Sequence, residues 1–331
     1  MRSGMTENNK SVFTNLALEF VRVTEAAAIS GAKWIGKGDG KAADGAAVDA
    51  MRSCFNQIDF CGEVVIGEGA KDEAPELYVG ERLGCKSDPM LDIAVDPLEC
   101  TASVAYGRPN AISVIAAGPA GSLYKAADSY MEKIAVSGKA AEVIDLDAPT
   151  KENIAKVARA LGKEIGEITV AVLDRPRHEE LIKQIRGAGA RVQLFTDGDI
   201  AMAIATCMRE SPVDILMGIG GSTEAVIAAA ALKCMDGEMF CRWKPLDFAL
   251  GKPNEKHIAR LRAAGITDFD RIFSVGDLAR GDDVTFTATG VISGPLLNGV
   301  VFSSEEVITH SVVISSRPKT IRFLKSRHIN N

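Results

Sequence analysis

Residues 169–224 read TVAVLDRPRHEELIKQIRGAGARVQLFTDGDIAMAIATCMRESPVDILMGIGGSTE and show the most regular pattern in the chain. Short apolar runs alternate with longer segments in which apolar residues recur at helical spacing. The expected elements are strands at 169–173, 191–195 and 215–217 and helices at 178–187, 199–208 and 222–235. This β-α-β-α-β-α order is typical of a parallel or mixed sheet covered by helices. The stretch therefore predicts an α/β fold in which the loops that follow the strands gather at one ligand crevice.

The pattern on either side of this stretch is less regular. Helices are expected at 12–35, 44–57, 150–161 and 252–265, and strands at 63–66, 91–95, 111–117, 284–289 and 312–314. The helix at 150 is expected to be capped by Thr150. The regular alternation of strands and helices begins near residue 150, so we expect two lobes, at 12–149 and 150–331. A flexible tail is expected at 1–11.

The composition excludes several classes of protein. The 331 residues are 47% apolar and 25% charged, which is ordinary for a globular chain, but only 5% are aromatic. So few aromatic platforms argue against a lectin or a protein that stacks nucleobases. The formal net charge of −6 disfavours general binding to nucleic acid or to an anionic membrane. It is compatible with a phosphate site in which metal ions lie between protein carboxylates and the substrate.

Cysteine and histidine usage indicates a reducing compartment and no zinc site. The seven cysteines, at 54, 61, 85, 100, 207, 234 and 241, include no CxxC pair, and we expect reduced thiols in the cytoplasm. The four histidines form no HExxH pattern. The first ten residues, MRSGMTENNK, contain no apolar segment of a signal peptide, and no apolar run is long enough to span a bilayer.

The motif VDPLECT at 95–101 places acidic groups directly after an apolar strand. Pro97 is expected to stop the strand, so that Asp96, Glu99 and Thr101 turn toward one point. Two carboxylates can hold Mg²⁺ or Mn²⁺, and the free N–H groups of a following helix can hold phosphate. The alternative is an Asp-Pro turn in which Glu99 caps a helix.

Two further acidic motifs are weaker when each is taken alone. Glu68 lies between glycines in VIGEGA at 65–70, where backbone and ligand can approach closely, but an ordinary β-turn also explains it. Asp44 in AADGAA at 42–47 is a candidate metal ligand, and a helix N-cap explains it as well.

The loops of the 169–224 stretch carry the candidates for phosphate and sugar binding. LMGIGGSTE at 216–224 combines a strand, a glycine loop and a helix start, which is a phosphate cradle without the GxGxxG or GKS/T patterns of nucleotide sites. Glu224 there is a metal ligand or a surface residue favoured by the helix dipole. Arg175 and Arg177 can bind phosphate, and Asp197 and Asp199 can accept hydrogen bonds from sugar hydroxyls. The alternatives are a solvated basic turn and an Asp-Gly turn.

Seven of these motifs together resemble one family. ADGA, VIGEG, DIAVDPLExT, SYMEK, RPRH, DGD and GIGGxxE occur in the order found in class II fructose-1,6-bisphosphatases, which are similar to the inositol-monophosphatase-like phosphatases. The resemblance spans about residues 12–328. It implies a layered α/β/α/β/α sandwich of two intimately packed lobes, with metal bound by the N-terminal lobe and substrate by the C-terminal lobe. It also implies hydrolysis of the 1-phosphate of fructose 1,6-bisphosphate in gluconeogenesis.

The resemblance also implies a set of site residues. The implied metal ligands, for Mn²⁺ or Mg²⁺, are Asp44, Glu68, Asp96, Glu99 and Glu224. The catalytic residues are Asp96, Glu99 and Thr101, and Thr101 helps to activate the attacking water. The implied substrate-binding residues are Glu99, Cys100, Thr101, Tyr130, Arg175, Pro176, Arg177, Asp197, Gly198, Asp199 and Gly221. A homo-oligomer, a dimer or a tetramer, is expected, with no nucleic-acid or membrane partner.

The chain departs from the family pattern at two places. Cys100 stands where the family usually has Gly, and Ser222-Thr223 and Ala225 stand where it commonly has Ala-Pro and Gly. These departures keep three alternatives open: another substrate, such as sedoheptulose 1,7-bisphosphate or an inositol phosphate, a sugar-phosphate sensor without turnover, and motifs that are structural turns only. Cys100 itself is either a redox-sensitive thiol or an inert buried one.

Overall fold

The computed structural model describes residues 7–69, 76–84, 90–247 and 252–329. The chain forms two compact units, unit 1 of Met1–Tyr124 with Arg280–Asn331 and unit 2 of Lys125–Ala279. This division differs from the expected boundary at 149/150, because the C-terminal strands pair with the N-terminal sheet rather than with the strands that precede them. Of the expected tail, residues 1–6 lie outside the described residues, and the first helix already begins at Glu7.

Unit 1 is built on one mixed sheet. Within the described residues its order is β13-β14-β12-β4-β3-β1-β2, with β15 paired to β14. The strands are β1 (Cys61–Ile66), β2 (Arg82–Gly84), β3 (Met90–Glu99), β4 (Ala111–Pro119), β12 (Thr285–Ile292), β13 (Val301–Phe302), β14 (Glu306–Ser316) and β15 (Lys319–Ile329). Only β1 and β3 run parallel; the other neighbours are antiparallel.

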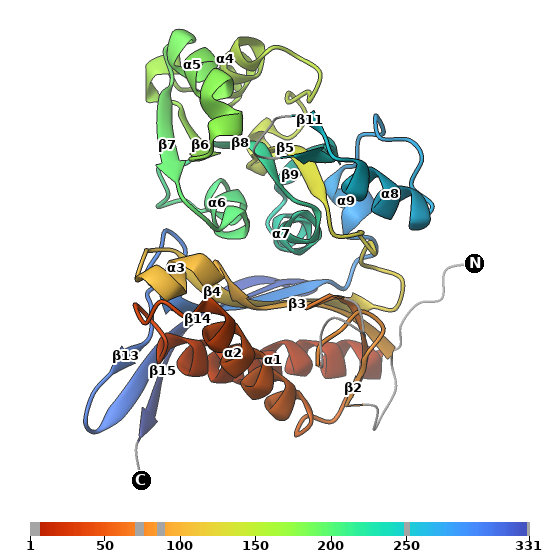
Figure 1. Ribbon diagram of the computed structural model, residues 1–331, viewed down its shortest axis with the longest axis vertical. Helices are drawn as coiled ribbons and strands as arrows, with labels where there is room; N and C mark the ends of the chain where they lie inside the picture. Colours follow the sequence, from red (N-terminus) through yellow and green to blue (C-terminus); the bar gives the residue numbers. More distant parts are fainter. Residues whose placement is uncertain (1–6, 70–75, 85–89, 248–251, 330–331) are drawn as a thin grey trace. The chain divides into compact units, whose positions relative to one another are not determined.

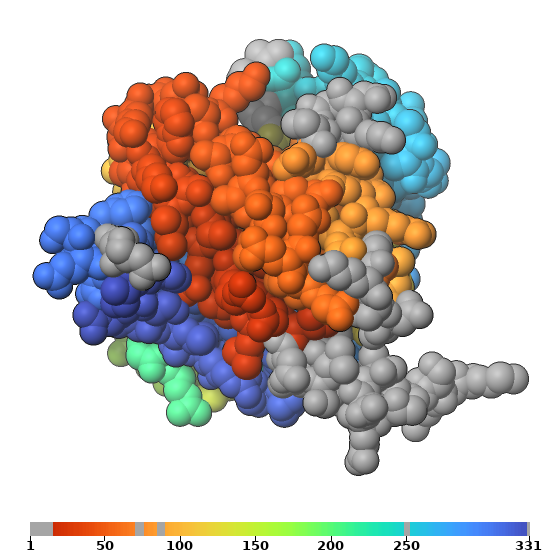
Figure 2. All heavy atoms as spheres, turned by 90° about the horizontal axis from the view of Figure 1, so that it is seen from below, coloured from red at the N-terminus to blue at the C-terminus, as the bar shows by residue number. Residues whose placement is uncertain are grey.

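Helices α1 (Glu7–Ala32) and α2 (Gly40–Phe55) lie along one face of this sheet (Figure 1). Phe20 of α1, Phe55 of α2 and Phe60 before β1 are buried, and their ring centroids are 5.4–5.8 Å apart. Such aromatic contacts join the helices to the sheet. In Figure 2 the red and orange atoms of α1 and α2 form much of the surface on this side, with the blue C-terminal strands beside them.

Unit 2 is built on a five-stranded sheet in the order β7-β6-β8-β5-β9. Its strands are β5 (Tyr130–Val136), β6 (Thr169–Leu173), β7 (Arg191–Phe195), β8 (Ile215–Gly221) and β9 (Glu238–Trp243). Strands β6, β7 and β8 are parallel, whereas β5 is antiparallel to both β8 and β9. Helices α4 (Thr150–Leu161) and α5 (Glu179–Gly187) cover one face, and α6 (Asp199–Ala205) and α7 (Ser222–Cys234) lie on the other (Figure 1).

Short elements complete both units. They are helices α3 (Thr101–Tyr106), α8 (Glu255–Ala263) and α9 (Val275–Leu278), 3₁₀ turns at Gly138–Ala140, Ile165–Glu167 and Pro176–His178, and the pair β10 (Leu246–Asp247) and β11 (Lys252–Pro253). Among the described helices, none combines the length and the apolar character needed to cross a bilayer.

The α/β fold class is confirmed, and each unit is a sheet covered by helices. The β-α-β-α-β-α order of residues 169–224 is confirmed, and two of its strands have the expected bounds. Helix α4 also begins and ends as expected, but the cap is wrong: Thr150 is the first helical residue and Pro149 is the N-cap, without a side-chain bond. The final segment differs most, because the expected strand 312–314 is part of the long hairpin β14–β15.

Candidate active site

Asp96 and Glu99 lie at the carboxyl end of β3 in unit 1. The expectation that Pro97 ends the strand is wrong, since β3 continues to Glu99 through an irregularity. Asp96 pairs with Val114 and Glu99 with Ile112, so three steps along β3 correspond to two along β4. An extra residue in one strand moves the residues after it to the other face of the sheet, so this bulge turns both carboxylates toward the same face. Pro97 fits there because a bulge does not need its missing N–H.

Glu68 follows β1, the parallel neighbour of β3. The register pairs Ile66 with Ala94, which places Glu68 and Asp96 at corresponding positions beyond the last pair. The backbone N–H of Glu68 donates to the carbonyl oxygen of Leu77 at 3.0 Å. A Cβ at Gly67 would overlap that same carbonyl oxygen. Glycine is therefore required at 67 for the chain to carry Glu68 to this edge.

Asp44 lies within α2 and is not its cap. The N-cap is Asp39, whose Oδ1 accepts from the backbone N–H of Ala42 at 2.9 Å. Asp44 is therefore one turn into the helix, on the face that it shares with Gly40. A Cβ at Gly40 would lie 3.1 Å from Cγ2 of Thr101. The face of α2 that carries Asp44 thus packs against the start of α3, two residues after Glu99.

The carboxyl groups of Asp44 and Glu68 share a hydrogen bond. Burial, followed by the charge of Asp44 and this hydrogen bond, raises the pKa of Glu68 to about 8. Burial also raises the pKa of Asp44, whereas the hydrogen bond from Glu68 lowers it. Two carboxylates in one partly buried site repel each other unless a proton or a cation lies between them. The pair is thus suited to a divalent cation, which prefers oxygen ligands.

The other candidates in unit 1 complete an all-oxygen donor set. Oδ1 of Asp96 accepts from the N–H of Leu98 at 3.0 Å, and Glu99 is 4% exposed. As the side chains stand, no three His, Cys, Asp or Glu groups within residues 7–69, 76–84, 90–247 and 252–329 converge closely enough to hold a metal ion. The donor chemistry fits Mg²⁺ or Mn²⁺, and a bound ion would require rotation of at least one further carboxylate toward the Asp44–Glu68 pair.

Thr101 begins α3, and Cys100 is its N-cap. Oγ1 of Thr101 donates to the carbonyl oxygen of Leu98 at 3.1 Å, which fixes the hydroxyl beside the strand end. Cys100 is buried and adopts a left-handed conformation, with φ 75° and ψ 47°. Such a conformation is strained for a residue with a Cβ, and it accounts for the glycine that related sequences are expected to have here.

Replacing Cys100 by Gly is expected to stabilise the protein. The change removes a left-handed strain of about 1–2 kcal/mol and costs about 0.5–1 kcal/mol of chain entropy, for a net gain of roughly 0.5–1 kcal/mol. Urea unfolding of the wild type and of Cys100→Gly measures it. Cys54→Gly is a matched control, because Cys54 lies in the helix α2 and its replacement should lower stability. Equal destabilisation by both changes would show that Cys100 is not strained.

In unit 2, Tyr130, Arg175 and Arg177 come together at the carboxyl ends of β6 and β8. Tyr130 begins β5 and pairs with Gly221 at the end of β8. The guanidinium carbon of Arg177 lies 6.0 Å from the Tyr130 ring centroid, and its Nη2 donates to the Ile219 carbonyl oxygen at 2.7 Å. Burial, followed by the charge of Arg175, lowers the pKa of Arg177. Two neighbouring cations can together bind a dianionic group such as phosphate.

Arg175 and Pro176 start the 3₁₀ turn at the end of β6, and Asp197 lies across from them after β7. Nη2 of Arg175 is 4.0 Å from Oδ1 of Asp197, and Nη1 donates to the Asp174 carbonyl oxygen at 3.0 Å. Gly198 adopts a left-handed conformation and is the N-cap of α6, which begins at Asp199. The RPRH and DGD motifs are therefore neighbours, as expected for loops that follow adjacent parallel strands at one edge of a sheet.

Gly221 ends β8 and is the N-cap of α7, so Glu224 lies in the first turn of that helix. Oγ1 of Thr223 donates to Oε2 of Glu224 at 2.8 Å. Burial and the charge of Asp199 raise the pKa of Glu224, and the charge of Lys133 lowers it. Ser222 is buried and its Oγ donates to the Ala127 carbonyl oxygen at 2.7 Å. This departure from the family pattern therefore binds the backbone rather than facing a ligand.

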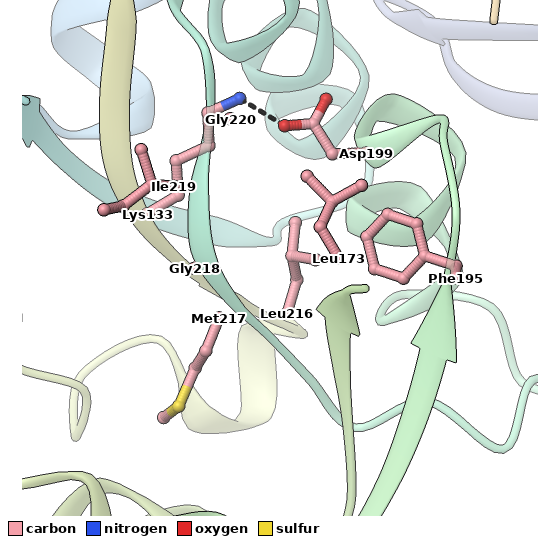
Figure 3. Close-up of a pocket in the computed structure, with 9 residues that line it drawn as sticks. All are labelled: Lys133, Leu173, Phe195, Asp199, Leu216, Met217, Gly218, Ile219 and Gly220. Atoms are coloured by element: carbon pink, nitrogen blue, oxygen red, sulfur yellow. Dashed lines mark hydrogen bonds and ion pairs between the residues drawn. The ribbon is translucent and has the colours of Figure 1, made fainter. Parts of the chain in front are cut away.

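Sequence reasoning missed two side chains of this site. Lys133 forms a buried ion pair with Asp199, its Nζ 2.6 Å from Oδ2 (Figure 3). Nδ1 of His178 is 2.8 Å from the Leu173 carbonyl oxygen, and its Nε2 accepts from the Ile219 N–H at 2.8 Å. The motifs SYMEK and RPRH contain both residues, but neither motif shows that its last residue is buried.

The chain is similar to one characterised family throughout. The family of bacterial, glpX-encoded fructose-1,6-bisphosphatases matches residues 14–328. Fructose-1,6-bisphosphatase 1 class 2 of Escherichia coli K12 is 44% identical over 319 residues, 95% of both chains. A fructose-1,6-bisphosphatase class 2 of Shigella flexneri shows the same identity and coverage. Among solved structures, an extragenic suppressor from Pyrococcus furiosus aligns with a TM-score of 0.32 and 15% identity, covering 62% of this chain and 73% of that one, which is too low to support an argument.

Proposed function

This chain belongs to the family of bacterial, glpX-encoded fructose-1,6-bisphosphatases, and from this premise we propose how its residues act. It is a phosphatase that hydrolyses fructose 1,6-bisphosphate to fructose 6-phosphate and phosphate. The observation that carries this conclusion is the 44% identity over 95% of both chains. The pairing of Asp44 on α2 with Glu68, which follows β1 at the strand edge where Asp96 also lies, supports it independently.

The family requires a divalent metal, and the proposed ligands are carboxylates. They are Asp44, Glu68, Asp96, Glu99 and Glu224. The first four belong to unit 1; for Glu224, in unit 2, the assignment rests on the resemblance alone. When bound, Mn²⁺ or Mg²⁺ neutralises phosphate charge and lowers the pKa of a coordinated water.

The residues of unit 1 then prepare the reaction in two ways. Burial and the charge of Asp44 raise the pKa of Glu68, so the pair holds a proton that a bound cation would replace. The hydroxyl of Thr101 donates a hydrogen bond to the Leu98 carbonyl oxygen, which leaves its Oγ1 lone pairs to accept a hydrogen bond from the attacking water and so to orient that water. Cys100, between Glu99 and Thr101, brings both residues to one point through its left-handed turn.

The residues of unit 2 hold the rest of the substrate. Arg175 and Arg177 bind the 6-phosphate, and Tyr130 supports Arg177 through its ring. Asp197 and Asp199 accept hydrogen bonds from sugar hydroxyls, while the backbone at Gly198 and Gly221 allows a close approach. Such remote contacts hold the 1-phosphate in line for hydrolysis.

Phosphate release from fructose 1,6-bisphosphate tests this proposal directly. Purified protein is expected to release phosphate with Mn²⁺ or Mg²⁺ and to lose that activity when EDTA removes the ion. Sedoheptulose 1,7-bisphosphate and an inositol monophosphate, assayed beside it, rank the substrates. A folded protein that binds fructose 6-phosphate but releases no phosphate with either ion would instead be a sugar-phosphate sensor. Activity that survives EDTA would exclude the metal ligands proposed above.

The setting of the enzyme is proposed on the same family basis. We expect a homo-oligomer, a dimer or a tetramer, in the cytoplasm, whose partner is the small sugar bisphosphate rather than nucleic acid or membrane. Light scattering of the purified chain measures the oligomeric state.

A further inference from the structure

We infer that Lys133 is a positioning residue: it holds the carboxylate of Asp199 in the orientation in which that residue binds the sugar. The inference rests on the proposed role of Asp199 in substrate binding. Lys133 lies on β5 between β8 and β9, where it pairs with Gly218 and Cys241. A lysine in the middle of a sheet that is covered on both faces requires a partner, because burial of an unpaired ammonium is strongly unfavourable.

The partner of Lys133 is Asp199, the first residue of α6. Nζ of Lys133 is 2.6 Å from Oδ2 of Asp199, and the two residues are 4% and 8% exposed. Figure 3 shows the lysine side chain extending past the backbone of β8 to reach the carboxylate. A charge-assisted bond this short, at a buried position, fixes the carboxylate far more firmly than a surface pair would.

The backbone of β8 restricts Asp199 further. A Cβ at Gly220 would overlap Oδ2 of Asp199 and would lie 3.2 Å from Nζ of Lys133. The ion pair therefore lies directly against the glycine loop that leads to Gly221. Lys133 engages Oδ2, and Oδ1 is the oxygen that we assign to the sugar hydroxyl.

Removal of Lys133 would release this restraint on Asp199. A buried ion pair that loses one member leaves the other without the group that fixes its orientation. The Asp199 carboxylate would then turn away from the position shown here, and a correctly placed acceptor for the sugar would be lost.

The test is a double-mutant cycle on the holoenzyme with a matched control. Lys133→Met is expected to raise KM for fructose 1,6-bisphosphate by about 10-fold or more, with a smaller change in kcat. In an Asp199→Asn background the same replacement is expected to change KM by less than about 2-fold. Lys133→Arg, which keeps the charge, is expected to recover part of the loss.

Lys163 and Asp214 provide the control. They form a second and more exposed Lys–Asp pair in unit 2, at 2.5 Å, near the starts of β6 and β8, where Asp214 also accepts from the Thr169 N–H at 3.0 Å. Lys163→Met is expected to lower Tm without a change in KM. If Lys133→Met behaves in the same way, or raises KM as much in the Asp199→Asn background as in the wild type, the positioning role is wrong.

A second variant and a binding measurement complete the test. If Lys133→Met does not fold, the double variant Lys133→Met/Asp199→Asn removes both charges, and its KM is compared with that of Asp199→Asn alone. Calorimetric binding of fructose 6-phosphate separates this inference from the proposed function. Loss of binding that depends on both Lys133 and Asp199 supports the positioning role even in a chain without turnover, whereas unchanged binding in Lys133→Met overturns it.

Discussion

Asp44→Asn is expected to lower phosphate release at least about 100-fold while it makes the metal-free protein more stable. The two effects have one cause. Asp44 and Glu68 are the proposed ligands of a cation, and without the cation their charges repel each other once Glu68 loses its proton. An amide at 44 keeps the hydrogen bond and removes the repulsion, but it binds a divalent ion poorly. If Asp44 had a purely structural role, its replacement would instead lower the stability of the protein.

The pH dependence of the metal-free protein provides the sharper measurement. The pKa of Glu68 is raised from 4.5 to about 8, so between these values the folded chain binds more protons at this site than the unfolded chain. The contribution of Glu68 to stability is therefore fully present below pH 4.5 and is lost as pH rises toward 8. Burial is the largest cause of the raised pKa of Glu68 and remains in Asp44→Asn, but the replacement removes the additional effect of the Asp44 charge, so its advantage over the wild type should grow from pH 5 to pH 8.

Thermal unfolding in EDTA across this pH range tests that expectation. Asp49→Asn is the matched control, because Asp49 is an exposed aspartate on the same helix. It should change neither the activity nor the pH slope. An Asp44→Asn protein that is less stable than the wild type at pH 8, or that keeps full activity, would remove the pair from the proposed metal site.

Much of the fold can be predicted from local periodicity, and the missed parts have a physical reason. The strands at 169–173 and 191–195 are apolar runs between helical patterns, so they can be recognised as strands from the sequence alone. Strand β5 was missed because its sequence, YMEKIAV, places Glu132 and Lys133 inside an apolar run. Those charges are tolerated because residues distant in the sequence pair with them: Arg242 and Lys244 with Glu132, and Asp199 with Lys133. No local pattern contains that information.

The candidate site could also be predicted only in part. Acidic and glycine motifs directly after strands could be placed together, because the carboxyl ends of neighbouring parallel strands share an edge. The bulge that turns Asp96 and Glu99 to one face could not be predicted, since it depends on the register with β4. For the same reason Pro97 was expected to end a strand that in fact continues. The strain at Cys100 could not be predicted either, because it follows from the positive backbone angle φ of this residue.

Arg177→Met is expected to lower kcat/KM for fructose 1,6-bisphosphate about 100-fold, but to change it by less than about 3-fold for fructose 1-phosphate. The proposed contact of Arg177 is with the 6-phosphate, which only the bisphosphate carries. Binding energy from this remote group holds the reacting phosphate in place, so its loss affects one substrate and not the other. Steady-state kinetics with both substrates measures the selectivity.

The structural role of Arg177 must be separated from this effect, because its Nε and Nη2 both donate to the Ile219 carbonyl oxygen. Arg177→Lys keeps the positive charge but cannot reproduce the two-donor geometry, and it is expected to fall between the wild type and Arg177→Met. Arg186→Met, an exposed arginine on α5, is the control for a change of net charge. If Arg177→Met lowers kcat/KM equally for both sugars, its function is to hold β8 through Ile219, and the 6-phosphate must be bound by other residues. A selective loss for the bisphosphate, with an unchanged Tm, can arise only from a contact with the remote phosphate.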